Sequence, residues 1–260
     1  MAEDFPSVPT LGALISEGLA FLAVFIVVIF LFIRYAKRKR TAALTLATTF
    51  TFWGLGALAV LVGSILQYIL LPAPNPGVIQ FTRYGFNLGY AFSAISNIYM
   101  VLFVSQIFAQ SPLFRKTGKI IPLINAILNG LTIGLIIDSI QTDPYNPAYG
   151  LTPTIYHLVL TIIAFAFLLG FSLIARKNSL YRWEKAGFSF IIGSALSGIM
   201  IYLMFALDRI ATLLIPGFEY GYTPFLYIGW ICAILMATLA YAGYVMPPNL
   251  RKWFSETEVK

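Results

Sequence analysis

The chain has 260 residues, of which 59% are hydrophobic and only 10% charged, and its formal net charge is +7. Soluble domains carry about 25% charged residues, so this composition excludes an ordinary soluble domain and predicts an integral membrane protein. The single cysteine, Cys232, excludes a disulfide within the chain.

The first apolar stretch follows an acidic N-terminus, MAEDFPSVPT, which lacks the basic region of a signal peptide, so we expect that stretch to remain as a membrane anchor. A membrane-spanning helix needs about 20 apolar residues. Seven stretches qualify and predict an all-α, polytopic seven-helix bundle that forms one domain. The predicted spans are residues 11–33, 43–71, 84–110, 120–140, 154–175, 185–206 and 224–245, followed by a short tail over 246–260.

Basic residues gather on one side of the predicted membrane. All Lys and Arg except Arg83 and Arg209 lie in the C-terminal tail or in and beside the loops that follow the first, third and fifth spans. The positive-inside rule then predicts an outside N-terminus and a cytoplasmic C-terminus in a multi-pass protein of the cell membrane. The basic run RYAKRKR comes directly after a span, where topology and anionic lipid explain it better than nucleic acid does.

The third span carries a row of mainly small or polar residues at every fourth position. They are Gly85, Gly89, Ser93, Asn97, Val101 and Ser105. Such rows mark close helix packing in membranes, so this helix is predicted to be the centre of the bundle. An alternative is that Ser93, Ser96 and Asn97 line a polar cavity.

A four-residue spacing drifts by about 40° per step around a helix with 3.6 residues per turn. The row is therefore predicted to pass more than one neighbouring helix. Gly85, Gly89 and Ser93 are interpreted as packing positions, and Asn97 as the member best suited to function. A second row, Ser189, Gly193 and Ser197 in the sixth span, is expected to pack on the third helix or on another protomer.

Ionisable residues avoid the middle of the predicted spans. Glu17, Asp138 and His157 fall in the outer third of their spans, and Asp208 comes just after the outer end of the sixth. One interpretation is an outward-facing ligand pocket containing these four residues. The other is that they meet water or lipid headgroups at the interface.

The residues present do not suggest an enzyme or a cofactor protein. No acid–base pair, nucleophile–base pair or metal-binding set can be assembled from them. A single histidine, His157, excludes haem held by two histidines of one chain and a three-histidine zinc site. All 14 prolines lie outside the middle of the spans, whereas transporters commonly break their helices there.

The end of the seventh span, LAYAGYVMPPNLRKWF, leaves the membrane through a Tyr/Gly stretch into Pro and a basic aromatic segment. In this feature the chain resembles the seven-helix sensory regions that precede prokaryotic histidine kinases. Its layout also resembles rhodopsins and G-protein-coupled receptors. Residues 224–245 contain no lysine to hold retinal, and the mid-helix prolines of class A receptors are absent.

The resemblance implies a non-enzymatic sensor that couples an outer or membrane-borne ligand to a cytoplasmic partner protein. The chain offers no output domain, so such a partner is expected. A first alternative is a structural or accessory subunit of a larger membrane complex, with the other subunits as partners. A second is a transporter of small solutes or lipids. The candidate ligand contacts are Glu17, Asn97, Asp138, His157 and Asp208.

Overall fold

The computed structural model describes residues 9–70, 79–145, 151–215 and 222–256, which form helices and no strand. The helices are α1 (Leu11–Arg38), α2 (Thr41–Leu70), α3 (Phe81–Ile107), α4 (Pro112–Thr117), α5 (Ile120–Thr142), α6 (Leu151–Asn178), α7 (Arg182–Leu214), α8 (Pro224–Val245) and α9 (Pro248–Glu256). All but α4 and α9 are long and apolar enough to cross a membrane. The predicted all-α membrane protein with seven spans is confirmed.

Several helices extend beyond the predicted apolar spans. Helix α1 continues to Arg38 and α6 to Asn178, because Lys and Arg favour helix and complement the negative C-terminal end of the helix dipole. Helix α7 runs to Leu214, since residues 207–214, beyond the predicted span, contain neither Gly nor Pro. Asp208 thus lies inside α7, and the prediction that it follows the helix was wrong.

Helix α4 was not predicted because it is too short and basic to stand out as a span. Its start has a local cause: the Ser111 side chain accepts a hydrogen bond from the Phe114 N–H, and Pro112 occupies the first helical turn. Both features stabilise a helix N-terminus. Helix α9 occupies most of the predicted tail and carries Trp253, which is exposed.

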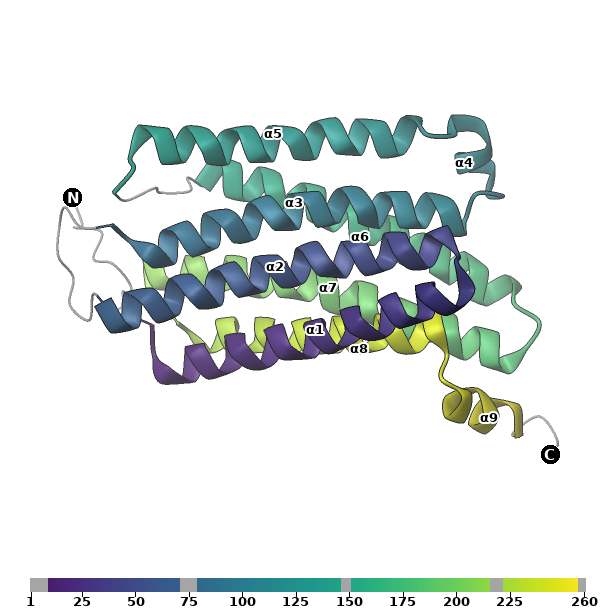
Figure 1. The fold of residues 1–260 in the computed structure, drawn as a ribbon. Helices are drawn as coiled ribbons and strands as arrows, with labels where there is room; N and C mark the ends of the chain where they lie inside the picture. Colours follow the sequence, from purple (N-terminus) through teal and green to yellow (C-terminus); the bar gives the residue numbers. More distant parts are fainter. Residues whose placement is uncertain (1–8, 71–78, 146–150, 216–221, 257–260) are drawn as a thin grey trace.

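Figure 1 shows the long helices side by side, with successive helices running in opposite directions. One end of the bundle, which we call the basic end, holds the α1–α2 turn, α4, the α6–α7 turn and α9. Helix α8 packs against both α7 and α1, which closes the bundle. Helix α3 contacts α2, α5 and α6, so the helix predicted to be central has several neighbours.

Helices α2 and α3 touch through their backbones. A Cβ atom added to Gly63 would lie 2.6 Å from the Phe81 carbonyl oxygen, and one added to Gly85 would lie 2.8 Å from the Ala59 carbonyl oxygen. One added to Gly56 would lie 3.1 Å from the Gly89 carbonyl oxygen. Small residues therefore allow the close approach that drives helix association in lipid.

The small-residue row predicted in the sixth span, Ser189, Gly193 and Ser197, lies on α7 and partly contacts α8. A Cβ atom on Gly193 would lie 3.2 Å from a Leu239 methyl group. Nearby, the Ser194 hydroxyl donates to the Met236 carbonyl at 2.8 Å. Gly193 therefore packs within the bundle, but against α8 instead of the expected α3. Ser189 is exposed and Ser197 half-buried, so only part of this row contacts the neighbouring helix.

Candidate functional site

Polar side chains from four helices are buried together inside the bundle, and we call this group the polar junction. Its members are Ser93 and Asn97 of α3, Asn125 and Asn129 of α5, His157 and Thr161 of α6, and Tyr202 of α7. Buried polar groups in a membrane need partners within the protein, because lipid offers none. The hydrogen bonds of the junction meet this need almost completely.

Asn97 links three helices. Its side-chain amide donates to Thr161 Oγ1 at 2.8 Å and to Asn129 Oδ1 at 3.4 Å. Its backbone carbonyl accepts a hydrogen bond from Asn125 Nδ2 at 3.1 Å. The Asn129 amide in turn donates to Asn125 Oδ1 at 3.1 Å. Loss of the Asn97 side chain would therefore break its hydrogen bonds to Thr161 of α6 and to Asn129 of α5.

His157 extends the junction to α7. Its Nε2 atom lies 3.1 Å from the Ser93 hydroxyl oxygen, which also makes a short hydrogen bond with the Tyr202 hydroxyl. The Thr161 hydroxyl lies 3.5 Å from the same Nε2 atom. Tyr90 and Tyr202 pack edge-on against the imidazole, with ring centroids 5.3 and 5.9 Å away. Polar contacts thus run without a break from α7 through α3 and α6 to α5.

One nitrogen of the junction has no partner. Among the described residues, His157 Nδ1 is buried without a hydrogen bond. A neutral imidazole has one donor and one acceptor nitrogen, so either tautomer leaves Nδ1 with an unmet donor or an unmet acceptor. An isolated unsatisfied polar group of this kind calls for an explanation.

His157 lies in the first third of α6, which begins at Leu151, as the sequence predicts. It also lies beside Ser93, which is near the midpoint of α3. The position of His157 along α6 alone did not reveal this neighbour.

The other candidate residues have separate surroundings. Asn97 and His157 belong to the junction, whereas Asp138 is exposed near the end of α5. Asp208 is bonded to Thr223 at the start of α8. Glu17 is fully buried on α1, so its interpretation as an interfacial side chain was wrong. Each of the three carboxylates thus has its own environment.

No family model, curated protein or solved structure matches this chain. The resemblance to sensory regions of histidine kinases therefore stays a prediction, while the seven apolar helices are shown. Within the part of the chain that the structure describes, no three His, Cys, Asp or Glu side chains come together as a metal site.

Glu17 has an unusual position for a carboxyl group. Both of its oxygens are buried beside the Ser64 hydroxyl of α2, but no contact between these groups meets the geometry of a hydrogen bond in the described structure. Burial of an unpaired carboxyl group is costly, so Glu17 is a poor contributor to stability.

We expect Glu17→Gln to leave the melting temperature of the purified protein unchanged or higher. The amide keeps the shape of the side chain and removes the possibility of an unpaired charge. Thermal unfolding followed by size-exclusion chromatography would measure this, with Ser64→Ala as the matched substitution on α2. A clear loss of stability in Glu17→Gln would mean that the carboxyl group has a structural partner.

Asp208 connects two helices. Its Oδ1 atom accepts hydrogen bonds from the Thr223 N–H at 2.8 Å and the Thr223 hydroxyl at 2.6 Å. Thr223 is the N-cap of α8 and accepts a hydrogen bond from the Phe225 N–H. The carboxylate therefore holds the start of α8 against the C-terminal part of α7.

Asp208→Ala should destabilise the protein by about 0.5–2 kcal/mol, the usual weight of a helix-capping interaction. Asp208→Asn keeps an acceptor oxygen and should retain most of the stability. Melting temperatures of the two variants provide the comparison. Equal stability of Asp208→Ala and the unsubstituted protein would contradict the capping role.

The sequence prediction missed Asn125, Asn129, Thr161 and Tyr202. A signal was present, because Asn125 and Asn129 are four residues apart and therefore on one face of an otherwise apolar helix. Two amides on one face of a membrane helix indicate a polar partner helix. Tyr202 offered no comparable signal, since tyrosines also occur at membrane interfaces.

Proposed function

We propose that this protein is a non-enzymatic seven-helix sensor of the cell membrane. In this proposal the polar junction couples an outer or membrane-borne ligand to a cytoplasmic partner that binds the basic end. The observation that carries the proposal is the unpaired His157 Nδ1 within a network that joins four helices. The positive-inside rule supports the cytoplasmic placement of the basic end.

Two properties of the junction suit a sensor. First, its members are joined in series, so a change at His157 alters contacts of α6, α3 and α7 together. Second, a ligand shifts a protein only when it interacts differently with two states. A state in which Nδ1 gains a hydrogen bond would supply such a difference. Asn97, in contact with both α5 and α6, would carry the change to a further helix.

The experiment is photocrosslinking in native membranes from Leu180, which is 86% exposed between α6 and α7 at the basic end. We expect one adduct of defined mass, with a yield that changes several-fold in His157→Phe. This variant keeps a planar ring and removes both nitrogens. The control is Ser105→Ala, because the Ser105 hydroxyl bonds only within its own helix, to the Leu102 carbonyl.

An adduct of the same yield in the unsubstituted protein, His157→Phe and Ser105→Ala would contradict coupling through the junction. Absence of any specific adduct would contradict a cytoplasmic partner at this turn.

A second candidate function is an accessory subunit of a membrane complex. It is favoured by Gly130 and Gly134, which lie on the exposed side of α5 with open space where a Cβ atom would be. Small residues four apart allow another membrane helix to pack closely. Native mass spectrometry of membrane extracts would show an assembly of fixed stoichiometry that Gly134→Leu disrupts and Gly170→Leu does not. A monomer in all samples would contradict this alternative.

A further inference from the structure

The basic end contains a pocket of about 460 Å³ beside the α1–α2 turn. Its lining combines the end of α1, the start of α2 and single residues of α3 and α8. The lining includes Arg34, Arg38, Arg40, Ala42, Ile107 and Tyr244. Small-molecule sites commonly have volumes of about 300–1,000 Å³, so the pocket is large enough for more than a single ion.

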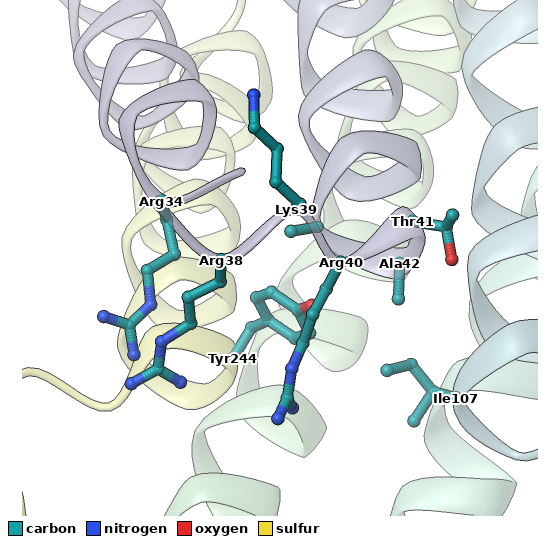
Figure 2. A pocket seen from close by; sticks show the side chains of 9 residues that line it. Arg34, Arg38, Lys39, Arg40, Thr41, Ala42, Ile107 and Tyr244 are labelled. Atoms are coloured by element: carbon teal, nitrogen blue, oxygen red, sulfur yellow. The ribbon is translucent and has the colours of Figure 1, made fainter. Parts of the chain in front are cut away.

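Figure 2 shows how the charged side chains lie around this pocket. The side chains of Arg34, Arg38 and Arg40 extend to the same side of the turn, with the Tyr244 ring between Arg38 and Arg40. Lys39 points away from them and lies over the Tyr35 ring. The concentrated positive charge therefore comes from the three arginines.

These arginines have no compensating charge nearby. Among the described residues, none of the three guanidinium groups forms an ion pair or a hydrogen bond. Arg34 is close enough to Arg38 and Arg40 to be repelled by both. The negative end of the α1 dipole amounts to only about half an elementary charge. Three full charges exceed what that dipole can neutralise, so the cluster favours an added anion.

The backbone adds further donors. Lys39 has a left-handed conformation with φ 52°, which turns the chain so that α2 starts beside the end of α1. The Arg40 carbonyl accepts hydrogen bonds from the N–H groups of Ala43 and Leu44. The N–H groups of Thr41 and Ala42 belong to the first turn of α2, which lacks partners within the helix. This positive end of α2 opens on the same pocket as the arginines.

We propose that this pocket binds a phosphate-bearing ligand. The phosphate group is held by Arg34, Arg38 and Arg40, because guanidinium groups bind phosphate through paired, charge-assisted hydrogen bonds. Ile107 and Ala42 give the pocket an apolar side. A lipid headgroup with its glycerol, or a soluble phosphate ester, shares this chemistry.

Two arms of one experiment distinguish these sources in the purified full-length protein. In the first, phosphatidic acid is titrated against protein in phosphatidylcholine nanodiscs and bound lipid is measured by native mass spectrometry. In the second, inorganic pyrophosphate is titrated into the same phosphatidylcholine nanodiscs and followed by calorimetry. Binding of phosphatidic acid alone identifies a lipid site. Binding of pyrophosphate identifies a site open to soluble phosphates.

The deciding variant is Arg34→Gln/Arg38→Gln/Arg40→Gln. A hydrogen bond to a charged group contributes about tenfold or more in affinity, so the triple variant should bind at least about a hundredfold more weakly. The control, Lys37→Gln/Arg115→Gln/Lys116→Gln, removes the same charge from the basic end without touching the pocket. It should bind nearly as well as the unsubstituted protein.

If the triple variant does not fold, Arg40→Gln alone serves as a milder variant. It should weaken binding about tenfold. Equal losses of affinity in the pocket variant and the control variant would mean that binding depends only on diffuse surface charge, and would overturn the proposal. Failure of both probes to bind would also overturn it.

Discussion

Gly63→Leu is expected to prevent formation of a stable, monodisperse bundle. The new Cβ atom would lie 2.6 Å from the Phe81 carbonyl oxygen and 3.0 Å from Gly85 Cα, both of which are backbone atoms of α3. Side-chain neighbours can rotate away, but these atoms move only if the two helices separate. Overpacking in a core costs about 1–3 kcal/mol even when side chains yield, and this substitution should cost more.

Gly170→Leu is the matched control, because a Cβ atom at Gly170 meets nothing within 4 Å. There the substitution only improves helix propensity, by about 1 kcal/mol at most, and should leave stability unchanged or slightly higher. Size-exclusion chromatography and thermal unfolding in detergent would compare the pair. Equal behaviour of the two variants would show that α2 and α3 are not in backbone contact.

Asn97→Leu should have the second large effect, on stability and on the proposed coupling to the basic end. It leaves the Thr161 hydroxyl without its amide donor and Asn129 Oδ1 without its interhelical partner. Buried polar groups that lose a partner cost about 1–3 kcal/mol each, although hydrogen bonds between membrane helices average only about 0.6 kcal/mol. We therefore expect a loss of about 1–3 kcal/mol in the free energy of unfolding.

A double-mutant cycle isolates the role of the junction. If Asn97 and Asn129 interact, Asn97→Leu/Asn129→Leu should cost less than the sum of the two single substitutions. Ser105→Ala, on the same helix but outside the junction, should cost little. Strict additivity of the two Asn variants would contradict a shared network. The same Asn97→Leu protein should also change the yield of the Leu180 crosslink.

The seven helices could be predicted from sequence because the length of an apolar stretch is set by the thickness of the membrane. The last span, residues 224–245, coincides with α8, which lies between Thr223 as N-cap and the left-handed Met246. Helix ends that lie in basic segments were harder to predict. Helix α1, for example, continues beyond its predicted apolar span to Arg38. The membrane fixes where a span must exist, but not where its helix stops.

Helix neighbours were less predictable. Almost every side of these helices is apolar, because some sides face lipid and others face protein, so hydrophobicity alone does not separate them. Gly85 and Gly89 indicated close packing, yet only the structure identified α2 as the partner. The row does turn as a 3.6-residue helix requires: Ser93 meets α6 and α7, and Asn97 meets α5 and α6.

The candidate site was predictable only in part. Asn97 stood out in the sequence because it is an amide in an otherwise apolar helix. In the structure it is buried among the polar side chains of the junction. The alternative of a cavity lined by Ser96 differs from the structure, in which the Ser96 hydroxyl donates to the Thr49 carbonyl of α2. His157 was identified as a candidate, but its contact with Ser93 depends on the relative heights of α3 and α6. Those heights are set by packing between helices that are distant in sequence.

The most direct test of coupling through the polar junction is a distance measurement at the basic end. In a Cys232→Ser background, spin labels at Lys116→Cys and Leu180→Cys would report on α4 and on the α6–α7 turn, both exposed. Pulsed electron paramagnetic resonance would compare this protein with and without His157→Phe. Coupling predicts a shifted or broadened distance distribution in the variant. Superimposable distributions, in proteins of equal thermal stability, would contradict it.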